Sequence, residues 1–62
     1  MSLTPKDCLY IEDLVTAIIL TIKKTECELK QVQEETVKTF LESMIEELKT
    51  QANMLVGIME EN

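Results

Sequence analysis

Residues that break helices are almost absent from this chain. Its one proline is Pro5 and its one glycine is Gly57, both near an end. Proline and glycine are the residues that most strongly interrupt a helix, and the sequence between these two positions contains neither. Apolar residues recur there at spacings of three and four, which is the period of an α-helix, and alternation by two is absent. These features predict an all-α fold.

The first helix has a well-marked start at Pro5. Thr4 is suited to accept an amide hydrogen bond as the N-cap, Pro5 fits the first helical position, and Asp7 occupies the position that completes a capping box. Leu3 and Cys8 stand at the two positions of a hydrophobic staple. All of these residues predict the same helix boundary.

The first helical segment is apolar on more than one side. Its main stripe, widened by Leu14 and Ile19, contains Cys8, Ile11, Val15, Ile18, Ile22 and Leu29. At about 100° per residue, a second set projects to nearly the opposite side. This second set is Leu9, Leu20 and Cys27. A helix that is apolar nearly all round is expected to be buried nearly all round, which one partner helix cannot achieve.

The second segment has one apolar stripe and one polar face. The stripe contains Val37, Phe40, Leu41, Met44, Ile45, Leu48, Ala52, Leu55, Val56 and Met59. The opposite face carries Glu42, Glu46, Lys49 and Asn53. The spacing predicts ion pairs between Glu35 and Lys38 and between Glu46 and Lys49. We expect the last residues, from Gly57 to Asn62, to fray, because acidic residues lie at the unfavourable end of the helix dipole.

Between these segments lies the polar stretch from Lys30 to Glu35, which has no strong turn residue. One uninterrupted helix of about 55 residues would be about 80 Å long and would expose both stripes unless it formed a long coiled coil. The two stripes are offset in phase, and the two-sided first segment does not fit a seam of a and d positions. We therefore expect one domain, residues 1–62, that folds as an antiparallel two-helix hairpin, with helices at about 5–30 and 34–59.

A chain of 62 residues hides too small a fraction of its surface to be comfortably stable alone. Disulfides, a structural metal or association usually supply the missing stability. With two cysteines and no histidine, association is the remaining route. We expect a homodimeric four-helix bundle, whose predicted oligomer interface is Leu14, Ile18, Ile22, Phe40, Met44, Leu48 and Leu55.

Net charge argues against two classes of partner. Six basic and twelve acidic residues give a net charge of −6, which repels both nucleic-acid phosphates and anionic lipid headgroups. The longest uncharged apolar stretch, Leu14 to Ile22, is far shorter than the roughly 20 residues that cross a bilayer. No secretory signal pattern follows Met1. We expect a cytoplasmic protein that binds neither nucleic acid nor membrane.

The residues of common catalytic and cofactor sites are missing. Without histidine there is no Ser-His or Cys-His nucleophile pair, and one glycine cannot build a phosphate-cradling loop. Bundles that hold two metal ions normally combine inward glutamates with Glu-x-x-His pairs. Here Glu42, Glu46 and Glu47 lie on the polar side, and only Glu26 approaches the buried side. We expect no enzyme activity, no cofactor and no metal.

Cys8 and Cys27 are nineteen positions apart in the same predicted helix. That spacing separates them by about 30 Å, whereas the Cα atoms of a disulfide lie within about 7 Å. They cannot pair within one hairpin. We interpret both as small apolar residues that fill packing layers, although an antiparallel dimer could bring copies of them together.

Several short motifs resemble the small spore-coat F type proteins of Gram-positive bacteria. They are Leu3-Thr4-Pro5-Lys6-Asp7, Tyr10-Ile11-Glu12-Asp13, Phe40-Leu41 and Glu46-Glu47-Leu48, and the resemblance covers about residues 3–59. Proteins of that type are ferritin-like helical hairpins, which implies that two copies form a four-helix bundle. This chain departs from ferritin-like metal sites in having no histidine and no inward glutamate pair, so the resemblance does not imply iron chemistry.

Two hypotheses about function follow. The first is a structural or assembly protein that acts through helix-helix association, with a relation to the spore coat. The alternative is an adaptor or regulatory subunit whose stripe of Leu9, Leu20 and Cys27 receives an amphipathic helix of another protein.

Overall fold

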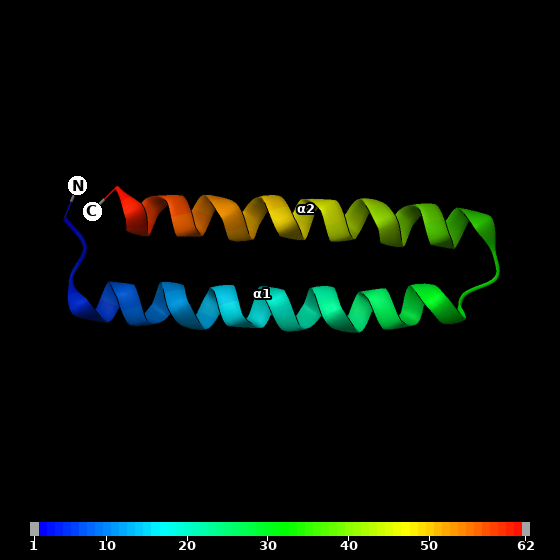
Figure 1. Ribbon diagram of the computed structural model, residues 1–62, viewed down its shortest axis with the longest axis horizontal. Coiled ribbons are helices and arrows are strands. Elements are labelled where there is room, and N and C mark those ends of the chain that lie inside the picture. Colours follow the sequence, from blue (N-terminus) through cyan, green and yellow to red (C-terminus); the bar gives the residue numbers. More distant parts are fainter. Residues whose placement is uncertain (1, 62) are drawn as a thin grey trace.

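The chain folds as two antiparallel α-helices that lie side by side. In the computed structural model, which describes residues 2–61, α1 runs Pro5–Gln31 and α2 runs Glu35–Glu60. The start of α1 and the end of α2 lie at one end of the hairpin, and the connecting loop lies at the other (Figure 1). The predicted all-α hairpin is confirmed, and the predicted helix boundaries agree with it to within one residue. The described helix continues through Gly57 to Glu60, where fraying was expected, and Asn62 lies outside the described residues.

The start of α1 has the predicted capping box. The Asp7 backbone N–H donates to Thr4 Oγ1 at 3.0 Å, and the Thr4 backbone N–H donates to Asp7 Oδ2 at 3.1 Å. These two bonds satisfy amide groups that a helix start otherwise leaves without partners. The predicted roles of Thr4, Pro5 and Asp7 at the start of the first helix are therefore confirmed.

The loop between the helices has only three residues, Val32, Gln33 and Glu34. Val32 is in extended conformation, and its N–H still donates to the Glu28 carbonyl at 3.1 Å. Glu34 is the N-cap of α2, with Oε2 accepting from the Val37 N–H at 2.9 Å. Bonds from the Val37 and Thr36 amides hold the pKa of the Glu34 carboxyl below its ordinary value of 4.5. The chain thus reverses direction without glycine or proline.

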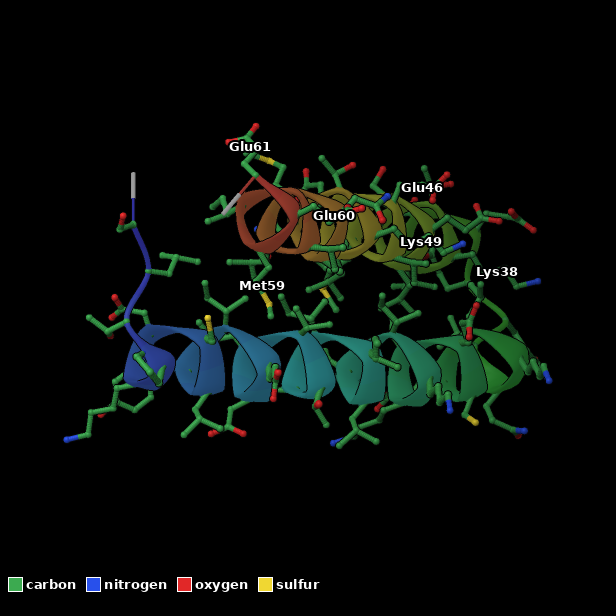
Figure 2. The ribbon with its side chains drawn as sticks, turned by 60° about the vertical axis from the view of Figure 1, so that its left-hand side comes forward. Lys38, Glu46, Lys49, Met59, Glu60 and Glu61 are labelled. Carbon is green, nitrogen blue, oxygen red and sulfur yellow. The ribbon has the colours of Figure 1, made fainter. Side chains whose placement is uncertain are left out.

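The two helices pack along a seam with the heptad spacing of a coiled coil. From Cys8 to Val32, every buried or half-buried residue follows spacings of three and four. The α1 series is Cys8, Ile11, Val15, Ile18, Ile22, Thr25, Leu29 and Val32. The α2 series is Lys38, Leu41, Ile45, Leu48, Ala52, Leu55 and Met59. Figure 2 shows Met59 pointing from α2 toward α1, whereas Glu61 points away.

This seam corrects one interpretation of the sequence. The first segment was expected not to fit a seam of a and d positions, yet its covered residues occupy only those positions. Thr25 occupies the seam position between Ile22 and Leu29, where the predicted stripe had no residue, and it is 2% exposed. Its hydroxyl donates to the Thr21 carbonyl at 2.7 Å, so the only polar atom of its side chain is satisfied within its own helix.

Both predicted ion pairs on α2 are present and exposed. Lys38 Nζ lies 3.9 Å from Glu35 Oε1, and Lys49 Nζ lies 3.8 Å from Glu46 Oε2. Pairs of this kind on a helix surface stabilise it by about 0.2–0.5 kcal/mol each. They support α2 locally and contribute little to the packing of the two helices.

Candidate functional site

The seam alone encloses very little. Within residues 2–61 only Ile45, at 6% exposure, and Thr25 are buried, and the remaining seam residues are half-buried. Among these described residues ten large apolar side chains are exposed, and Phe40 and Met54 reach 64%. Complete burial of one such side chain is worth about 1.5–3 kcal/mol, so the hairpin leaves much of its available hydrophobic stabilisation unused.

The exposed apolar residues are unevenly distributed around the seam. In an antiparallel pair of helices, the heptad positions g and c of both helices lie on one side of the seam, and positions e and b lie on the other. Six of the ten exposed apolar side chains occupy g and c positions, and half-buried Met44 joins them. We call this side, with the small residue Ala17, the apolar face. It consists of Tyr10, Leu14, Ala17, Val37, Phe40, Met44, Met54 and Ile58.

Surface grooves open on both sides of the seam. One open groove of about 380 Å³ is lined by side chains from both helices on the apolar face. Its lining is Leu14, Ile18, Gln51, Met54, Leu55 and Ile58. Ile18 and Leu55 belong to the seam, so this groove leads from the apolar face down to the layer between the helices.

The other side of the seam carries more charged side chains than the apolar side. We call it the acidic face, after Glu12, Glu26, Glu42, Glu46 and Glu60. Two further grooves open there, one beside Glu12 and Glu60 and the other beside Glu26, Glu42 and Glu46. Leu9, Ile19 and Val56 are also exposed on this side, and the groove beside Val56, of about 570 Å³, is also lined by Val15 and Met59.

The predicted interface residues fall into two groups. Leu14 and Phe40 are 52% and 64% exposed on the apolar face, and half-buried Met44 lies with them. The other four lie half-buried in the seam between α1 and α2 of the same chain, and they are Ile18, Ile22, Leu48 and Leu55. Sequence reasoning missed Tyr10, Val37, Met54 and Ile58 as members of the face. Their heptad positions, counted from the seam, are the signal that would have found them.

The predicted single stripe of the second segment divides in the structure. Six of its members lie in the α2 seam, whereas Val37, Phe40 and Met44 lie on the apolar face and Val56, 41% exposed, lies on the acidic face. The stripe was broad because it combined the residues of the seam with residues that flank it on both sides.

The second predicted set of α1 does not form one surface. Leu9 and Leu20 are 58% and 60% exposed, but Leu9 is rotated toward the acidic face, while Leu20 and Cys27 lie on the outer side of α1. Both cysteines are free thiols. Cys8 is half-buried in the seam, and Cys27 is exposed, so Cys27 does not fill a packing layer within the hairpin.

The described residues form neither a metal-binding cluster nor a membrane-spanning helix. No three side chains of His, Cys, Asp and Glu within residues 2–61 lie together in a way that could hold a metal ion. Over the same range, neither helix combines the length and apolar character needed to cross a bilayer. Glu26, which was expected to approach the buried side, is exposed beside the groove that contains Leu29 and Ile45.

Comparison with known proteins identifies no relative. No family model, no curated protein and no solved structure matches this chain.

Proposed function

We propose that this protein is a non-enzymatic structural or assembly protein whose apolar face packs against the same face of a second copy. The resulting particle is an antiparallel four-helix bundle with the acidic faces outside. The observation that carries this proposal is the one-sided exposure of large apolar side chains, with Leu14, Phe40 and Met54 each more than half exposed on the same face. Exposed apolar patches of this kind mark association surfaces.

The size of the face supports a second copy as the occupant. The hairpin measures 46 × 15 × 11 Å, and its broad sides contain both helices (Figure 1). A side 46 Å long and 15 Å wide offers roughly 700 Å² per chain, close to the approximately 800 Å² per partner of a standard stable interface. A two-fold dimer also covers the same patch on both chains with a single contact.

The resemblance of several short motifs to spore-coat F type proteins supports the same assembly, because those proteins are ferritin-like helical hairpins and the resemblance implies that two copies form a bundle. Involvement in a coat is the corresponding biological proposal. The free, exposed Cys27 thiol fits a reducing compartment such as the cytoplasm.

An adaptor that receives a partner helix on Leu9, Leu20 and Cys27 is the second candidate, favoured by the 58% and 60% exposure of its two leucines. It has less support, because the grooves described above include none of these residues.

A pair of matched substitutions separates these functions. Met54→Glu places a charge on the apolar face, and Leu20→Glu places one on the outer side of α1 at similar exposure. In sedimentation equilibrium, Met54→Glu should weaken dimerisation at least tenfold, because two apolar burials are lost in each dimer and 1.4 kcal/mol corresponds to a factor of ten. Leu20→Glu should leave it unchanged. Equal effects of the two variants would contradict the assignment of the apolar face.

A further inference from the structure

The apolar face changes character along its length. Near the chain ends it presents Tyr10, Leu14, Met54 and Ile58, and near the loop it presents Val37, Phe40 and Met44. Between these two patches lies a polar zone at the same g and c positions. Its members are Thr21, Lys24, Glu47 and Gln51, and all four are exposed; Glu28 lies beyond them, level with Met44.

From this pattern, and resting on the proposed function, we infer the orientation of the second copy. The geometry points to a dimer in which both loops lie at the same end, with Lys24 of each copy facing Glu47 of the other. The argument compares two arrangements, because a two-fold axis between two stacked faces runs either along the helices or across them.

With the axis along the helices, α1 of one copy packs on α2 of the other in antiparallel direction. Each residue then meets the residue that lies level with it in its own hairpin. Leu14 shares a groove with Ile58, so these two form one level, and the heptad register places Thr21 with Gln51 and Lys24 with Glu47. Leu14 therefore meets Ile58, Thr21 meets Gln51 and Lys24 meets Glu47, so that opposite charges face each other, whereas Glu28 meets Met44.

With the axis across the helices, α1 packs on α1 and the loop end of one copy meets the terminal end of the other. Lys24 then falls near Leu14 of the second copy, and its ammonium group faces no carboxylate of the apolar face. A cation placed on an apolar side chain loses water without gaining a partner. Charge arrangement across an interface of this kind selects orientation more than it adds affinity.

Charge exchange tests the contact. Lys24→Glu places four carboxylates at the two contacts of the dimer, and Glu47→Lys places four ammonium groups there. Each variant alone should dimerise about tenfold more weakly than the wild type, since each dimer contains two altered pairs. An equimolar mixture of the two variants should recover wild-type affinity, because each mixed dimer restores two opposite-charge pairs. Lys23→Glu, on the acidic face beside Lys24 in sequence, is the matched control and should have no effect.

Mixing also identifies where the contact lies. If Lys24 acted on Glu47 of its own chain, each variant would retain its repulsion in the mixture, and affinity would not recover. That outcome would overturn the inferred contact.

A distance measurement tests the orientation independently. A spin label at Gln33→Cys, in a Cys8→Ala, Cys27→Ala background, places one probe on each loop. Loops at the same end should give an interspin distance well below the 46 Å length of the hairpin. A distance near 46 Å in a dimer would overturn the inferred orientation and leave the proposed function standing. A monomer in all wild-type samples would overturn both.

Discussion

Replacing Ile45 with alanine should destabilise the hairpin more than any comparable substitution on its surface. Ile45 is the only buried apolar side chain among residues 2–61, at 6% exposure, and the antiparallel heptad register places it opposite Thr25. The substitution removes a branched side chain from the level where the two helices are most completely covered.

The magnitude follows from burial. Truncation of a buried isoleucine to alanine costs about 2–5 kcal/mol, from the lost transfer energy and the cavity that remains. Two helices joined by a short loop can partly collapse into the cavity, so we expect the lower part of this range, about 2–3 kcal/mol. Because small proteins have net stabilities of only about 5–15 kcal/mol, this loss should clearly lower the midpoint of unfolding.

The assay is urea unfolding followed by circular dichroism at one fixed protein concentration. Ile19→Ala is the matched control, because Ile19 is the same residue type at 43% exposure on the acidic side of the seam. It should cost less than half as much as Ile45→Ala. Similar losses from both substitutions would refute the assignment of the seam.

Three further outcomes are expected. Because backbone hydrogen bonds lower the pKa of Glu34, the stabilising effect of its carboxylate is fully present above pH 4.5 and is lost as the pH falls through the lowered pKa of the folded state. Glu34→Ala should remove this part of the acid sensitivity in a pH series of thermal melts. An unchanged acid profile would contradict the role of Glu34 as the cap. Gly57→Ala should raise the free energy of unfolding by about 0.5–1 kcal/mol, because Gly57 is helical and an added Cβ meets nothing within 4 Å. A loss of stability would mean that the added methyl group clashes with a neighbouring atom. Reducing agent should change neither the thermal midpoint nor the mass, because both thiols are free, and a lower midpoint on reduction would reveal a disulfide.

The sequence was sufficient to predict those parts of the fold that depend on neighbouring residues. The capping box of Thr4 and Asp7 and the ion pairs of Glu35 with Lys38 and Glu46 with Lys49 all involve residues three positions apart. Such interactions are set by local helix geometry and need no knowledge of the partner helix.

Other parts depend on contacts that residue type does not reveal. Thr25 and Lys38 occupy seam positions although neither is apolar, so a search for hydrophobic residues alone breaks the heptad pattern at both sites. Thr25 tolerates burial because its hydroxyl bonds to the Thr21 carbonyl. Lys38 keeps its ammonium group near Glu35 while its aliphatic stem covers the seam.

The loop was the least visible element in the sequence. Its residues include no glycine or proline, and glutamate is a weaker N-cap than Ser, Thr, Asp or Asn. Glu34 nevertheless caps α2 through the Val37 amide, which is a feature of the folded backbone. The apolar face was only partly predicted. Its members are recognised by their heptad positions relative to the seam, and the seam is located only once the two helices are packed together.

The central claim is that this hairpin becomes fully stable only when its apolar face is covered by a second copy. The most direct test is circular dichroism together with analytical ultracentrifugation of the unmodified chain over about a hundredfold range of dilution, because a fold that requires association loses stability as its concentration falls. Helicity and dimer fraction should decline together, and Ile18→Asp should abolish both. A helical monomer whose stability is independent of concentration would contradict the account.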